Sequence, residues 1–157
     1  MNVTVDSCKK RATHAMEHFL KVFSFVPDDK LDWKPVATAK SALEIAAHCA
    51  GYSNGFAGII ASGAFPADVQ EFLGPIQARI ESIRTREEAE AMLRQGTAET
   101  LAALDAVKPE WIDSTVETPI GPTPFLFFMT IPANHLVNHT GQIDYLQTCW
   151  GDQEVHF

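Results

Sequence analysis

The sequence predicts an all-α fold, a four-helix bundle with a long crossover connection between its second and third helices. Four segments place apolar residues three and four positions apart, the spacing that lines one face of an α-helix. No long stretch alternates between apolar and polar residues as a half-buried strand would. Residues 64–84 separate the second and third segments, and a connection of this length suits a crossover better than a tight hairpin. We expect a single domain over residues 1–157.

The first two helices carry start or stop signals. The first is expected over residues 5–26, and Pro27 ends it. The second begins after Ser41, because Ser41 with Glu44 three residues later is a capping-box pattern, and it stops at Gly63. The apolar stripe of the first helix consists of Val5, Ala12, Met16, Phe19, Leu20 and Phe23.

The crossover and the third helix follow. Within the crossover we expect a short helix over about residues 75–83, starting at Pro75. A second capping-box pattern, Thr85 with Glu88, announces the third helix, which runs to about Val107. Its buried side is predicted to consist of Ala89, Met92, Leu93, Gly96, Ala103 and Val107.

The last part of the chain is predicted to be an extended excursion and then a helix. Residues 111–124 are rich in threonine, proline and glycine, which favours a short extended segment with a turn. The fourth helix is expected to have Thr123 as its N-cap and Pro124 at its first position. It should end at Trp150, with Gly151 as the C-terminal cap.

Charge and hydropathy exclude two classes of partner. The formal net charge is −8, and the lysines and arginines are scattered, so no cationic patch is available for a nucleic-acid backbone. No uncharged apolar run reaches 18 residues, and no signal-peptide pattern opens the chain, so we expect neither a membrane span nor export.

The cysteines predict a cytoplasmic protein. Cys8, Cys49 and Cys149 are odd in number and lack metal-site spacing, so they are interpreted as reduced thiols. Cys49 lies about 100° from His48 around the second helix, which favours a packed thiol over a nucleophile.

Two histidines on the fourth helix are the strongest functional signal. His135 and His139 are four residues apart and therefore share a helix face, which also carries Gln142. That face is apolar at both ends, so two imidazoles there need partners. A divalent metal would satisfy both; hydrogen bonds to backbone and water are the alternative.

The other histidines are weighed by the faces they occupy. His48 lies on the apolar stripe of the second helix, where it is either a metal ligand or a satisfied core histidine. If His48, His135 and His139 converge, they would bind a divalent transition metal and leave a coordination position open. His14 and His18 have the same four-residue spacing but lie opposite the apolar stripe, which predicts solvent exposure. His156 follows the last helix, and nothing in the pattern requires it at the site.

Three local motifs carry a family resemblance. They are Leu31-Asp32-Trp33-Lys34-Pro35, Ser41-Ala42-Leu43-Glu44-Ile45-Ala46-Ala47-His48 and His139-Thr140-Gly141-Gln142-Ile143. Together with the His135-x-x-x-His139-x-x-Gln142 spacing, they make the whole chain similar to the DinB/YfiT-like superfamily. The resemblance implies a four-helix bundle with a long crossover, often a homodimer, that holds nickel, zinc or iron through His48, His135 and His139.

The resemblance also implies an activity, with alternatives. Characterised relatives include transferases and isomerases that use low-molecular-weight thiols. The leading hypothesis is therefore a metal-dependent enzyme of thiol-transfer or hydrolytic type acting on a small molecule. The alternatives are a non-catalytic metal-binding or stress-related dimer whose metal is structural or sensed, and a metal-free interaction protein with structural histidines.

Four further residues have open roles. Gln142 is expected either to hydrogen-bond a ligand imidazole or metal-bound water, or to serve in packing. Glu44 either supports the site as an acceptor or base, or acts only in its capping box. Close helix packing would explain Gly141, which is otherwise merely tolerated. Trp33 is expected to anchor its loop over the end of the bundle.

Overall fold

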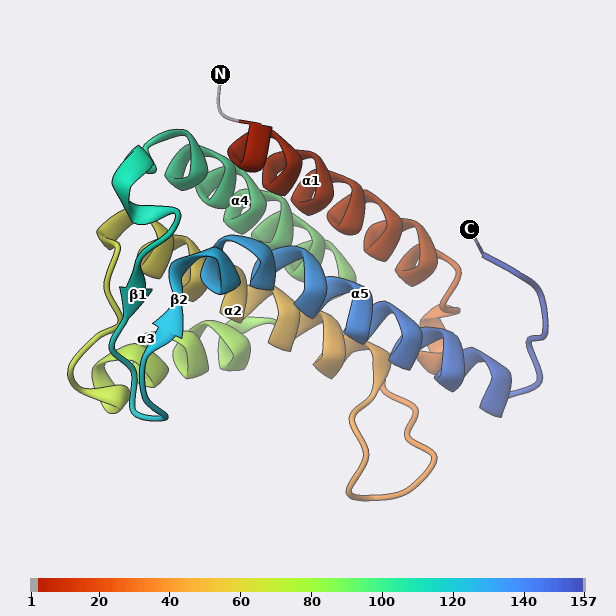
Figure 1. Ribbon diagram of the computed structural model, residues 1–157. Helices are drawn as coiled ribbons and strands as arrows, with labels where there is room; N and C mark the ends of the chain where they lie inside the picture. Colours follow the sequence, from red (N-terminus) through yellow and green to blue (C-terminus); the bar gives the residue numbers. More distant parts are fainter. Residues whose placement is uncertain (1–2, 157) are drawn as a thin grey trace.

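The computed structural model describes residues 3–156 and is built almost entirely of helices (Figure 1). Its α-helices are α1 (Val3–Ser24), α2 (Ala42–Ser62), α3 (Val69–Ser82), α4 (Arg86–Asp105) and α5 (Phe125–Cys149). Short 3-10 helices η1 (Asp28–Lys30) and η2 (Pro109–Trp111) and strands β1 (Thr115–Val116) and β2 (Thr123–Pro124) complete the described elements. No helix between residues 3 and 156 is long and apolar enough to cross a membrane.

The four long helices form the predicted bundle. α1 packs against α4 and α5, and α2 packs against the same two helices from the other side. α3 lies in the crossover between α2 and α4 and packs on α2 (Figure 1). The expected all-α fold with a long crossover is therefore confirmed.

The two predicted capping boxes begin α2 and α4. The Ser41 hydroxyl accepts a hydrogen bond from the Glu44 amide (3.2 Å), and the Glu44 carboxylate accepts one from the Ser41 amide (2.8 Å). Thr85 and Glu88 make the same reciprocal pair at the start of α4. Gly63 ends α2 in the left-handed conformation, with φ of 67°.

The crossover helix is longer than predicted. α3 begins at Val69 rather than Pro75, because the Asp68 carboxylate caps it by accepting from the Gln70 amide (2.8 Å). Pro75 therefore lies inside the helix. Asp68, followed three residues later by Glu71, is the helix-start signal at this position in the sequence.

The predicted start of the last helix is wrong by one residue, because Pro124 rather than Thr123 is its N-cap. Thr123 and Pro124 form β2, which pairs with β1 in an antiparallel register, and α5 begins at Phe125. The Thr123 hydroxyl bonds to the Gly121 carbonyl (3.2 Å) instead of capping the helix. The predicted extended excursion and turn is confirmed, with Gly121 at φ of 104°.

The other helix ends lie within two residues of expectation. α1 ends at Ser24 and α4 at Asp105, each two residues early, whereas α5 ends at Cys149 with Trp150 as its cap. Trp33 packs edge-on against Trp150, with ring centroids 5.6 Å apart. It thus anchors the η1–α2 connection to the end of α5, as predicted.

Candidate metal centre

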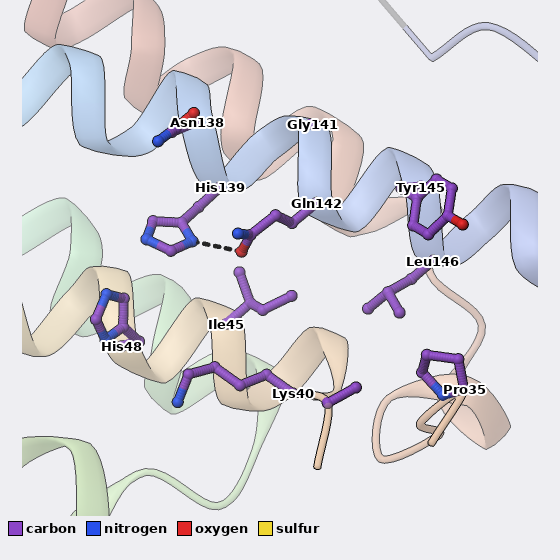
Figure 2. A pocket seen from close by; sticks show the side chains of 11 residues that line it. Pro35, Lys40, Ile45, His48, Asn138, His139, Gly141, Gln142, Tyr145 and Leu146 are labelled. Carbon is purple, nitrogen blue, oxygen red and sulfur yellow. Dashed lines mark hydrogen bonds between the residues drawn. The ribbon is translucent and has the colours of Figure 1, made fainter. Parts of the chain in front are cut away.

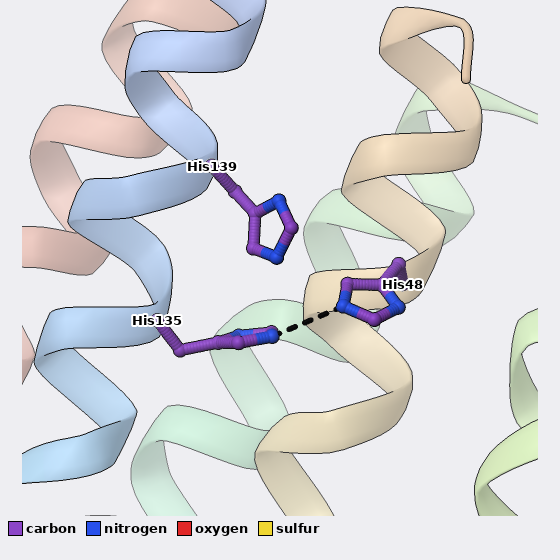
Figure 3. A group of neighbouring side chains, drawn as sticks. All are labelled: His48, His135 and His139. Carbon is purple, nitrogen blue, oxygen red and sulfur yellow. Dashed lines mark hydrogen bonds between the residues drawn. The ribbon is translucent and has the colours of Figure 1, made fainter. Parts of the chain in front are cut away.

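His48, His135 and His139 meet between α2 and α5. α2 presents His48 and α5 presents the other two, and the three rings turn toward one another (Figure 3). One ring nitrogen from each residue lies within 4.8 Å of the others. Ring centroids are 5.0 Å apart for His48 and His135, 4.7 Å for His48 and His139, and 4.5 Å for the α5 pair. The predicted convergence is confirmed.

The donor set fits a divalent transition metal. The Nε2 atoms of His48 and His135 are 3.1 Å apart. Two nitrogens bound to one zinc ion at about 2.0–2.1 Å in a tetrahedral arrangement lie roughly 3.3–3.4 Å apart, so this pair is already at ligand spacing. Neutral imidazoles suit zinc, nickel and iron, and three of them leave at least one coordination position open.

Gln142 orients one of the three rings. His139 Nδ1 donates a hydrogen bond to Gln142 Oε1 at 2.7 Å, one turn further along α5 (Figure 2). With Nδ1 carrying the proton, the lone pair of His139 lies on Nε2, the nitrogen left for a metal. Of the two roles considered for Gln142, the structure shows the bond to an imidazole.

Two aromatic side chains of α2 pack against the histidine rings. The Tyr52 ring lies 4.6 Å from that of His48, and the Phe56 ring lies 5.3 Å from that of His135. Burial, together with the charges of His139 and Lys40, lowers the pKa of His48 to about 4. Burial and the two neighbouring histidines lower the pKa of His135 to about 3. Both rings are therefore neutral at physiological pH, the state in which imidazole binds metals.

A cavity of about 620 Å³ opens beside the triad. His48 and His139 form part of its wall, between the start of α2 and the second half of α5 (Figure 2). A volume in this range can hold a small organic molecule. The remaining wall residues are Pro35, Ala39, Lys40, Ile45, Asn138, Gly141, Gln142, Tyr145 and Leu146. Of these, Pro35, Ile45, Gly141 and Gln142 belong to the family motifs. No local pattern in the sequence points to Ala39, Lys40, Asn138, Tyr145 or Leu146.

The remaining histidines lie elsewhere. His14 is exposed on α1, as predicted, whereas His18 is only partly exposed; their rings are 6.3 Å apart. His156 is buried, but it stacks on Phe25 and bonds to Asp152 (2.9 Å), away from the triad.

Three other residues have purely structural surroundings. Burial alone would raise the pKa of Glu44, but bonds from Lys34 (2.6 Å) and the Ser41 amide outweigh it, so that pKa is lowered and the carboxylate is fully engaged. The capping box and the Lys34 ion pair therefore account for Glu44 without a role at the histidines. Cys49 is completely buried, which raises the pKa of its thiol and confirms a packed side chain. Close packing at Gly141 is contradicted, because a Cβ there would meet nothing within 4 Å.

Family comparison agrees with this geometry. A profile described as the DinB superfamily matches residues 11–143, a range that contains the three histidines and Gln142. The chain belongs to the DinB superfamily. No curated protein matches the sequence significantly.

Solved structures with DinB-family descriptions share this fold. A DinB-like protein of Bacillus subtilis aligns with a TM-score of 0.70 and 18% identity, over 96% of each chain. A protein of Exiguobacterium sibiricum described as a candidate member of the DinB family aligns with a TM-score of 0.72 and 18% identity, over 99% of this chain and 97% of its own.

One similar structure is an enzyme. The mycothiol-dependent maleylpyruvate isomerase aligns with a TM-score of 0.68 and 12% identity over 91% of this chain. The DinB chain spans only 63% of that isomerase, and at this identity the likeness extends to the fold alone.

Proposed function

We propose that this DinB protein binds nickel, zinc or iron through His48, His135 and His139, and that it is a metal-dependent enzyme of thiol-transfer or hydrolytic type. The observation that carries the proposal is the meeting of three imidazoles with ring nitrogens within 4.8 Å of one another. Two of them, His48 and His139, line a cavity large enough for a small molecule. A purely structural site would be closed by the protein, whereas this one borders open space.

The residues around the cavity have different proposed roles. The three histidines would hold the ion, and Gln142 keeps His139 in the required tautomer. When bound, such an ion lowers the pKa of a thiol or water that it contacts and so makes a nucleophile near neutral pH. No carboxylate lines the cavity, so its wall offers no acidic residue as a general base.

A free low-molecular-weight thiol is the proposed nucleophile. Cys49, the cysteine nearest to the triad in sequence, is buried and keeps its proton, so it is unsuited to attack a substrate. The cavity has room for a small thiol beside His48 and His139. The dependence of a similarly folded isomerase on mycothiol supports the same choice.

Metal content of tag-free protein tests the site. We expect close to one transition-metal ion per wild-type chain by elemental analysis, and a large loss in His139→Ala. His14→Ala is the matched control, because His14 belongs to an identically spaced pair on the exposed face of α1. Wild-type protein that takes up no zinc, nickel or iron would refute the proposal.

Thiol chemistry separates an enzyme from a non-catalytic metal protein. Metal-loaded protein should bind small thiols and turn over thiol-conjugation, isomerisation or hydrolysis substrates. A chain that holds its metal but neither binds thiols nor reacts would instead fit a structural or sensing role.

The proposal includes a cytoplasmic homodimer. Unpaired cysteines at positions 8, 49 and 149 fit a reducing compartment. Exposed Leu126 and Phe127 at the start of α5 offer an apolar surface for a second copy. Sedimentation of the purified protein would show a monomer if this part is wrong.

A further inference from the structure

We propose that the ligand of the cavity beside the histidines is an anionic small molecule and that Lys40 binds its negative charge. This inference rests on the proposed function, because it names the chemical class of the molecule that occupies that cavity. It makes Lys40 a residue that determines specificity, a role not implied by the three metal ligands.

The charge on the cavity wall is the first observation. Eleven residues line the cavity, and Lys40 is the only lysine or arginine among them (Figure 2). None of the eleven is an aspartate or glutamate, although the chain has 20 acidic and only 12 basic residues. A cavity with one fixed positive charge and no acid favours an anion over a neutral or cationic ligand.

Lys40 has no counter-ion of its own. Other lysines nearby are paired, with Lys30 3.7 Å from Asp29 and Lys34 2.6 Å from Glu44. Lys40 forms no ion pair with any residue between 3 and 156. Asp32, Glu44 and Glu81 line a neighbouring cavity with Lys40, but none of them forms an ion pair with it. Both Glu44 oxygens already accept hydrogen bonds from other groups. The ammonium is therefore available to a ligand.

Lys40 also stands where a ligand beside the triad would extend. It directly precedes the N-cap Ser41, and its side chain runs past Ile45 on the same side of α2 as His48 (Figure 2). Lys40 and His48 line the same cavity, so a ligand that lies against His48 can also reach the ammonium. Across the cavity, Asn138, Gln142 and Tyr145 from α5 add neutral hydrogen-bonding groups.

Two thiols of nearly equal size test the inference. 3-Mercaptopropionate and 3-mercapto-1-propanol differ mainly by one negative charge. Their dissociation constants can be measured by NMR from the backbone amide shifts of Asn138, Gly141 and Gln142, in zinc-loaded and in metal-free full-length protein. We expect the anionic thiol to bind about fivefold more tightly, within the range of one exposed ion pair, and we expect the preference to shrink in 1 M salt.

Variants assign the preference to Lys40. Lys40→Gln should remove the fivefold difference, and Lys40→Arg should retain most of it. Lys30→Gln is the matched control, because Lys30 is paired with Asp29 and does not line the cavity. Circular dichroism of each variant checks that the fold is unchanged.

The outcomes distinguish this inference from the proposed function. Equal affinity for the two thiols, or an undiminished preference in Lys40→Gln, would overturn the inference whether or not zinc is bound. A Lys40-dependent preference in protein that takes up no metal would uphold the inference while refuting the metal site.

Discussion

His139 is held in a different way from the other two converging histidines. His139 is oriented by Gln142 on its own helix, whereas His48 and His135 lie against the rings of Tyr52 and Phe56. The first arrangement fixes a tautomer, and the second removes water and keeps both rings neutral. The two effects act on different residues and can be tested separately.

The contribution of Gln142 can be measured as a change in metal affinity. Gln142→Leu removes the acceptor for His139 Nδ1–H, so the ring loses its orientation, and zinc affinity should fall by about tenfold. Gln142→Glu keeps an acceptor and should keep the affinity. Competition with a chromophoric chelator gives both constants; equal affinity in the leucine variant would show that the bond does not orient the ligand.

The lowered histidine pKa values predict a pH-dependent stability of the metal-free protein. The pKa values of His48 and His135 are about 4 and 3 in the folded state, against about 6.5 in an unfolded chain. Below pH 6.5 the unfolded chain therefore takes up protons that the folded chain does not. This contribution to stability should be fully present above about pH 6.5 and should be lost progressively between pH 6.5 and about 3.

Urea denaturation in the presence of a chelator checks this prediction. A His48→Gln/His135→Gln double variant should lose this part of the pH dependence, while exposed His14→Gln should keep it. Identical pH profiles for the wild type and the double variant would contradict the prediction.

At the level of the helices, two glycines allow α3 and α4 to pack closely against α2. A Cβ at Gly96 on α4 would lie 2.5 Å from the Ser53 Cβ on α2, and one at Gly51 would lie 2.6 Å from Ile80 Cγ1 on α3. These contacts keep α4 and α3 close against α2. The position of α2, and with it His48, depends on this packing.

Two alanine substitutions separate packing from helix propensity. Gly96→Ala should destabilise the protein by about 1–3 kcal/mol, because α2 and α4 must move apart to admit the methyl group. Gly58→Ala is the control: this exposed α2 position has nothing within 4 Å of an added Cβ, so helix propensity should stabilise it by up to about 1 kcal/mol. Both changes are read from urea unfolding, and a neutral Gly96→Ala would show that the interface yields easily.

For the whole molecule, the proposed metal would join two helices that are far apart in sequence. His48 comes from α2 and the other two ligands from α5, across the crossover and α4. An ion that binds only the folded chain adds its binding free energy to stability, about 4 kcal/mol at a thousand times its dissociation constant.

Metal removal should therefore lower the melting temperature. For a domain of this size 4 kcal/mol corresponds to roughly 10 °C, measurable by differential scanning calorimetry before and after chelation. His139→Ala should melt at the same temperature with and without chelator. A wild-type protein that is insensitive to chelation would contradict a metal bridging α2 and α5.

Local signals were enough for much of the fold. Ser41 with Glu44 and Thr85 with Glu88 placed the starts of α2 and α4, because a capping box involves only residues of one helix turn. The cap predicted at Thr123 is wrong because Thr123 pairs with Val116 in the β1–β2 ladder. That pairing joins residues seven positions apart, so the local cap pattern could not predict it. Asp68 is a local cap signal of the same kind, and it, not Pro75, marks the start of α3.

By itself, the sequence determined the helical class, the main helix boundaries and the shared face of His135 and His139, since helix periodicity is a property of neighbouring residues. Only the tertiary structure decided that His48 meets them, that Gly96 rather than Gly141 sits at a close contact, and that Lys40 faces the same cavity. These contacts join residues of different helices. They depend on the distances between the helices and on how each helix is turned about its axis, which the local sequence does not specify.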